Sequence, residues 1–131
     1  MLKTDLPIIA AKKERARLSN LSRPEIQEKF EYHKKSIEEY YNIGSKKIRG
    51  ELSSFEIDVP VYLSEEAKEI FKETDTYKVE FSTDSLGNEK MKIEGNLSEN
   101  KDFTKKYSQY SFYYSGYHES VFSYLEYLLK N

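Results

Sequence analysis

The chain has 131 residues and no cysteine, so it fits one domain and excludes disulfides, thiolate catalysis and Cys-ligated zinc. Its net charge of −2 is uneven: residues 1–50 carry 12 Lys/Arg against 7 Asp/Glu, residues 51–100 carry 5 against 13, and residues 101–131 carry 4 against 3. This split predicts one basic and one acidic face, and because no apolar run approaches the roughly 18 residues of a membrane span, we expect a cytoplasmic protein without a membrane partner.

The first 21 residues are predicted to form a basic arm or a short helix, followed by a single α+β domain over residues 22–131. A helix over about residues 6–18 would carry the densest cationic cluster of the chain. Its members are Lys12, Lys13, Arg15 and Arg17. This cluster is interpreted either as a solvated helix face or as a contact for phosphates or an acidic partner surface.

A long helix is predicted to start at Ser22, because Ser22 and Glu25 have the spacing of a capping box. The apolar seam that follows has helical spacing and consists of Ile26, Phe30, His33, Ile37 and Tyr40. Gly44 is predicted to end this helix. The seam would pack on the chain's own sheet or, as the alternative, on a dimer or partner helix.

The middle of the chain predicts short strands and a short acidic helix. A second basic cluster comes first, formed by Lys46, Lys47 and Arg49. Alternating apolar residues over 55–63 predict a strand, and Pro60 assigns it to a sheet edge or a bulge. Ser64 would then cap a helix, and four glutamates in and after it are predicted to contact a protein partner. They are Glu65, Glu66, Glu69 and Glu73.

Two further strands are expected around residues 77–81 and 91–93, joined by the turn residues 84–88. Residues 103–116 are ambiguous, since their aromatic residues keep helical spacing while Tyr and Phe favour strands. We predict a fourth strand here, ended by Ser115 and Gly116, and a final helix over residues 118–129. The fold class is therefore α+β: a small antiparallel sheet of three or four strands packed against an N-terminal helical pair, a short middle helix and a C-terminal helix.

The sequence contains no catalytic or metal-binding motif. It lacks a Walker loop, a G-x-G-x-x-G run and an H-x-x-x-H pair. His33 is interpreted as a boundary residue of the helical seam, and His118 as the weak alternative of a general acid. We expect no enzyme, no cofactor and no metal.

The surplus of tyrosine is more informative. Seven tyrosines lie within residues 107–127, and a buried phenol needs a hydrogen-bond partner. We interpret these rings as partly solvent-exposed residues at the boundary of the core. The alternatives are a role in a protein interface and base stacking on a single-stranded nucleic acid. The predicted partner contacts among them are Tyr107, Tyr110, Tyr113 and Tyr114.

The leading hypothesis is a non-enzymatic inhibitor or accessory protein that occludes or recruits a larger protein partner, such as a nucleic-acid enzyme. Its source is expected to be a phage, a virus or a mobile element, and the ratio of 17 Lys to 4 Arg is typical of AT-rich genomes, as in many low-GC bacteria, their phages or archaeal viruses. One alternative is a nucleic-acid-binding regulator that uses the basic clusters. Another is a self-assembling structural protein. The chain would be a monomer or a homodimer.

Overall fold

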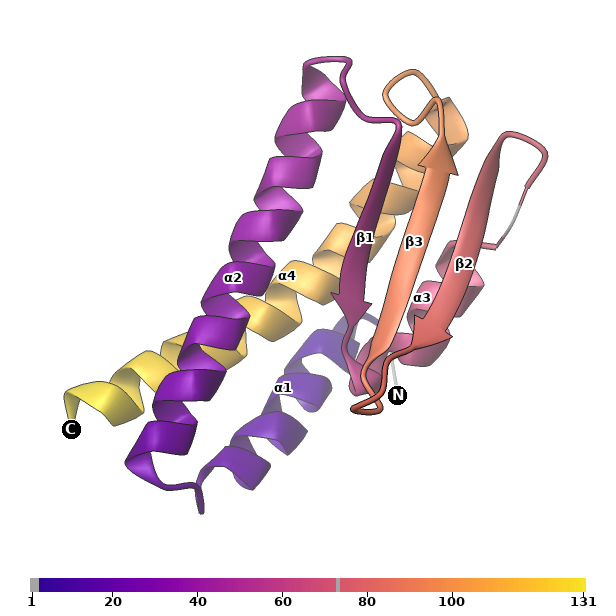
Figure 1. Cartoon of the computed structure of the whole chain (residues 1–131). Coiled ribbons are helices and arrows are strands. Elements are labelled where there is room, and N and C mark those ends of the chain that lie inside the picture. The colour runs from indigo at the N-terminus through magenta and orange to yellow at the C-terminus, as the bar shows by residue number, and fades with distance from the viewer. Residues whose placement is uncertain (1–2, 73) are drawn as a thin grey trace. The chain divides into compact units, whose positions relative to one another are not determined.

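The structure is a computed structural model that describes residues 3–72 and 74–131 (Figure 1). The chain divides into two compact units, unit 1 with Met1–Glu38 and Ser111–Asn131 and unit 2 with Glu39–Tyr110. The α+β class is confirmed, since the described residues form four α-helices and a three-stranded antiparallel sheet. The predicted domain boundary after residue 21 stays a prediction.

Unit 1 is helical. A 3-10 turn (Lys3–Asp5) leads into α1 (Leu6–Leu18), and the other members are the first part of α2 (Arg23–Ile48) and the last part of α4 (Lys101–Lys130). Within this unit α2 and α4 run antiparallel, because Arg23 Nη2 donates to the carbonyl of Leu129 (2.5 Å), while the Phe30 and Phe122 rings stack 4.7 Å apart. The predicted capping box is confirmed: Ser22 Oγ donates to Glu25 Oε1 (2.7 Å), and the amide of Glu25 donates back to Ser22 Oγ (3.4 Å).

Helix α1 buries small and aliphatic side chains on one side, among them Ala10, Ala11 and Leu18. Pro7 of α1 lies close to α4 at Gly116, where a Cβ would be 3.0 Å from Pro7 Cβ. The prediction that Ser115 and Gly116 end an element was wrong, because both residues lie within α4.

Unit 2 contains the sheet, with strands β1 (Ser54–Val59), β2 (Tyr77–Thr83) and β3 (Glu89–Gly95) in the order β1-β3-β2 (Figure 1). Strand β1 is an edge strand, as predicted from the missing N–H of Pro60, but it ends at Val59, so the prediction that it continues to residue 63 was wrong. A 3-10 turn, η2 (Val61–Leu63), and helix α3 (Ser64–Ile70) follow. One sheet face carries the apolar residues, among them Ile57, Met91 and Ile93, which are almost fully buried.

Helix α2 does not end at Gly44, so that prediction was wrong. The helix continues to Ile48, and Gly50 takes the left-handed backbone conformation (φ 75°) that terminates it. The Gly50 amide donates to the Lys47 carbonyl (3.1 Å) and the Glu51 amide to the Lys46 carbonyl (2.9 Å), which together form a Schellman motif. A glycine ends a helix only where the chain needs a positive φ, and Gly44 keeps helical geometry.

The predicted fourth strand was also wrong, because residues 103–116 belong to the single helix α4. Asn100 begins the helix, since its Oδ1 accepts a hydrogen bond from the amide of Phe103 (2.9 Å). The aromatic residues spaced four and three apart are buried along one side, including Phe103, Tyr110, Tyr114 and Tyr117. Burial at helical period thus outweighs the strand propensity of Tyr and Phe.

Candidate functional site

The most unusual polar feature of unit 1 is a buried pair of histidines, His33 on α2 and His118 on α4. Their Nδ1 atoms lie 2.8 Å apart, and the side chains are 2 % and 0 % exposed. Aromatic rings surround the pair: Tyr114 lies 4.4 Å and Tyr117 5.0 Å from the His118 ring, centroid to centroid. At this N···N distance one nitrogen must donate and the other accept, so one proton lies between the rings.

The surroundings also assign the tautomer of each ring. No described residue forms a hydrogen bond with Nε2 of His118, which is buried. Because a buried N–H without an acceptor is rarer than an acceptor without a donor, we place the His118 proton on Nδ1, where it donates to His33 Nδ1. The His33 proton then lies on Nε2.

Burial keeps both rings neutral. Desolvation, together with the positive charge of Lys29 as the smaller cause, lowers the pKa of His33 to about 4. Desolvation likewise holds the pKa of His118 well below 6.5, with His33 as the second cause. The pair therefore links α2 to α4 within unit 1 through a neutral hydrogen bond, and its nitrogens contact each other instead of solvent. A general acid needs its proton within reach of a substrate. In this packing the Nδ1 proton of His118 faces His33, where a substrate would have no access to it.

Three predicted glutamates lie on α3 of unit 2. Glu65 and Glu69 are exposed and Glu66 is half-buried, while Glu73 lies outside the described residues. Helix α3 is tied to β3 at Glu89, whose carboxylate accepts a hydrogen bond from Ser64 Oγ (2.5 Å) and pairs with Lys68 Nζ (3.1 Å). The exposed carboxylates therefore have a fixed position beside the sheet.

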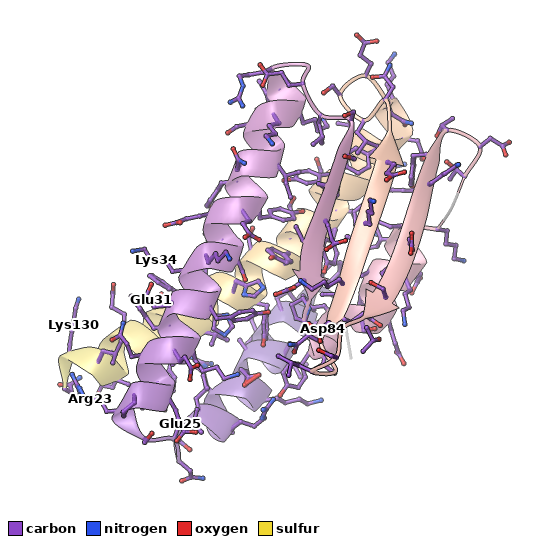
Figure 2. The ribbon with its side chains drawn as sticks, in the orientation of Figure 1. Arg23, Glu25, Glu31, Lys34, Asp84 and Lys130 are labelled. Carbon is purple, nitrogen blue, oxygen red and sulfur yellow. The ribbon has the colours of Figure 1, made fainter. Side chains whose placement is uncertain are left out.

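Two exposed aliphatic side chains lie at the same end of that sheet. Val59, Glu89 and Thr83 form one row across the three strands. Val61 follows this row in η2, directly after β1 and Pro60, and Leu86 follows it in the β2–β3 turn, where Figure 2 labels the nearby Asp84. Val61 is 73 % and Leu86 84 % exposed. We call this part of unit 2, formed by Val61, Glu65 and Leu86, the hairpin end.

The cationic residues of the first cluster lie on α1, outside the stripe that this helix buries. Lys12, Lys13 and Arg17 are exposed, and no described residue forms an ion pair with either lysine. Arg15 lies over the Tyr124 ring at 5.9 Å, and Arg17 pairs with the buried Glu14 at 3.4 Å.

The second basic cluster belongs to unit 2, at the end of α2. Lys46 is exposed and Lys47 half-buried, and Arg49 pairs with Glu51 at 3.1 Å. The first cluster thus lies on unit 1 and the second on unit 2. Contact with a nucleic acid or an acidic partner stays a prediction for both clusters.

The four tyrosines predicted as partner contacts are mostly packed inside the units. Tyr110 is 0 %, Tyr114 1 % and Tyr113 7 % exposed, and Tyr107 is half-buried. A partner role for the first three stays a prediction, and it would require the rings to leave this packing.

Several of these phenols bond within the fold. Tyr107 Oη donates to the carbonyl of Tyr40 (2.9 Å), Tyr114 Oη to that of Ser36 (3.5 Å), and Tyr117 Oη to a Glu14 carboxylate oxygen (3.4 Å). Burial raises the pKa of Tyr107 to about 12. These three phenols thus find acceptors on a neighbouring helix, so burying their hydroxyls does not leave them without a hydrogen-bond partner.

Sequence reasoning missed the histidine pair and the hairpin end. The sequence does indicate the pair, because His33 lies on one helical seam and His118 lies four residues after Tyr114 of another. It also indicates Leu86, which is a large apolar residue in a turn of polar residues and glycine.

The described residues contain no group of three or more His, Cys, Asp or Glu that would hold a metal ion. Within the same residues, no helix combines the length and the hydropathy required to cross a bilayer. Comparisons with protein-family models, with curated proteins and with solved structures found no significant match to the chain.

Proposed function

We propose that the protein is a non-enzymatic inhibitor or accessory protein of a phage, a virus or a mobile element, and that it binds a larger protein through the hairpin end of unit 2. The partner surface would be basic and would hold an apolar recess. Occlusion or recruitment of a nucleic-acid enzyme fits this chemistry, because such enzymes carry basic grooves for phosphates.

The observation that carries the proposal is the exposure of Val61 and Leu86 next to an acidic helix. Interfaces combine apolar anchors with a charged rim, and complementary charge accelerates the encounter of the two proteins. Glu65 has no ion pair with any described residue, so its charge is available to a partner. The carboxylates would attract the basic surface, and the two aliphatic side chains would fill its recess.

The test is affinity capture of the tagged full chain in lysate of its native host, with and without nuclease. Wild type is expected to retain one larger protein in both conditions. Two variants should each capture at least about tenfold less of that protein than wild type. V61S/L86S removes the apolar anchors, and E65K/E66K/E69K/E73K reverses the charge.

The matched control is Ile48→Ser, which removes another strongly exposed aliphatic side chain of unit 2 (86 %) away from the hairpin end. It should capture as much partner as wild type. Equal capture by all variants would overturn the assignment of the hairpin end. Loss of all capture on nuclease treatment would favour a nucleic-acid function instead.

A nucleic-acid-binding regulator is the second candidate, favoured by the exposed Lys12, Lys13 and Arg17 on α1. This function predicts that log Kd for duplex DNA changes with log salt by about 0.9 for each phosphate contacted. The variant K12Q/K13Q/R17Q should reduce that slope by up to about 3. The control K101Q/K105Q, also on exposed residues, should leave it unchanged, and absence of binding at low salt would end this candidate.

A further inference from the structure

The two edges of the sheet in unit 2 differ in how they are protected. Natural edge strands avoid pairing with other chains by means of proline, bulges, short length or charged side chains, and β2 carries only the last of these, at Lys78 and Glu80. Strand β1 is followed at once by Pro60. Strand β2 has seven residues without proline or glycine, and it pairs with β3 in an unbroken register from Tyr77↔Gly95 to Thr83↔Glu89. At the start of β2 the Tyr77 carbonyl accepts the amide of Thr74 (3.4 Å), so the part of this edge that is open to a further strand begins at Val79.

The hydrogen-bond pattern identifies the backbone groups on this edge. The Asp84 amide donates to the Asn88 carbonyl (2.9 Å), and this pair continues the β2–β3 register. Because bonded pairs alternate in an antiparallel ladder, Lys78, Glu80 and Ser82 bond to β3. Val79 and Phe81 then point their N–H and C=O groups to the open edge, where no described residue bonds to them.

The side chains on this edge carry a self-complementary charge pattern. On the polar face of the sheet Lys90 pairs with Asp58 (3.1 Å) and Lys92 with Glu94 (3.0 Å). Lys78 and Glu80 lie on the same face, are exposed, and form no ion pair with a described residue. They flank Val79 on either side, so a two-fold axis at Val79 exchanges the position of the lysine with that of the glutamate.

We propose that β2 pairs antiparallel with β2 of a second copy of this chain, centred on Val79. The Val79 groups of the two copies would exchange both backbone hydrogen bonds, which requires the outward orientation that the ladder assigns to them. Lys78 would then lie opposite Glu80 of the second copy, and Glu80 opposite its Lys78, in the closely spaced non-bonded positions. The two sheets would join into one sheet of six strands.

The apolar side of the edge and a surface hollow agree with this register. Phe81 would lie opposite Tyr77 of the second copy, and both residues are on the apolar face. A surface hollow of about 280 Å³ beside this edge is lined by Lys78, Val79, Glu80, Lys92 and Glu94, so the charged residues of the edge adjoin open space. A peptide of unrelated sequence would not match both charges, which is why we assign the edge to a second copy.

Charge exchange tests the register in the purified full chain. Sedimentation velocity over a range of concentrations should show a reversible wild-type dimer. Lys78→Glu and Glu80→Lys each place like charges opposite one another twice in a dimer, so each should raise the dimer Kd about tenfold or more. The double variant K78E/E80K restores both opposite-charge pairs and should dimerise like wild type, as should an equimolar mixture of the two single variants.

Amide hydrogen exchange supplies a second measurement on wild type. The amides of Val79 and Phe81 should exchange more slowly as the dimer forms, whereas that of Ser82, already bonded to β3, should not change. A wild-type chain that stays monomeric at its solubility limit would overturn the proposal, as would single variants that dimerise like wild type. Because no partner protein is present, failure here would leave the function of the hairpin end to its own test.

Discussion

At the scale of single residues, the buried histidine pair of unit 1 has the clearest physical consequence. His33 and His118 share one proton between their Nδ1 atoms and are kept neutral by burial. In the unfolded chain both would titrate near their ordinary pKa of about 6.5. The unfolded state therefore binds more protons than the folded state below that pH, and the free energy of unfolding must fall as the solution is acidified.

We expect this loss to extend from about pH 6.5 down to about pH 4, the folded pKa of His33. Above pH 6.5 neither state binds these protons, so the contribution is constant there. Within the window the loss approaches about 1.4 kcal/mol per pH unit for each histidine. Urea unfolding at pH 7.5, 6.0 and 5.0 would measure it.

The control is His33→Leu/His118→Leu, which removes both titrating rings and retains apolar bulk. Its free energy of unfolding should depend less on pH between 6.5 and 5 than that of wild type. Parallel pH profiles for the two proteins would show that the histidines are not neutral in the fold.

At the scale of elements, α4 shows how a helix with unfavourable local propensity is stabilised. Its tyrosines and phenylalanines favour strands, yet they recur at helical spacing and bury one side of the helix. Asn100 supplies the start, where its side chain accepts the Phe103 amide. Most of the stability of such a helix comes from packing, and the cap defines where it begins.

Asn100→Ala should lower the free energy of unfolding by about 1 kcal/mol, because it leaves the Phe103 amide without its acceptor. Denaturant titration followed by far-UV circular dichroism would measure the change. Asn100→Asp should retain most of the stability, since a carboxylate also caps. The exposed loop variant Asn96→Ala should change it by less than about 0.5 kcal/mol, and an equal loss in all three would argue against the cap.

At the scale of the whole molecule, charge is distributed differently in space and in sequence. Unit 1 carries 10 Lys/Arg against 8 Asp/Glu, a net charge of +2, and unit 2 carries 11 against 15, a net charge of −4. The contrast is smaller than between the first 50 residues and the next 50, because α2 and α4 each contribute to both units. Unit 2 remains acidic, which agrees with a basic partner surface for the hairpin end.

The aromatic residues of α4 organise the core of unit 2. Phe103 is fully buried and lies within 5.8–6.1 Å, ring to ring, of Phe55, Phe71, Tyr77 and Tyr107. These rings come from β1, β2, α4 itself and the chain directly after α3. One side chain thus contacts three other parts of the unit.

Phe103→Ala should therefore lower the free energy of unfolding by about 3–5 kcal/mol. Phe112→Ala is the matched control, because it makes the same change in the same helix at a ring that is 53 % exposed. It should cost less than about 1 kcal/mol. Chemical denaturation would compare the two variants, and similar losses would contradict a core centred on Phe103.

The sequence alone determined the features that depend on local chemistry and on period. The α+β class, the capping box at Ser22, the strand alternation and the edge position before Pro60 follow from hydrogen-bonding capacity and from where apolar side chains recur. Only the tertiary structure decided three others: the helical state of residues 103–116, the end of α2 at Gly50, and the meeting of His33 with His118. In each case the local sequence was ambiguous or gave no indication. The outcome depended on burial against residues distant in the chain or, for α2, on the backbone angle of one glycine.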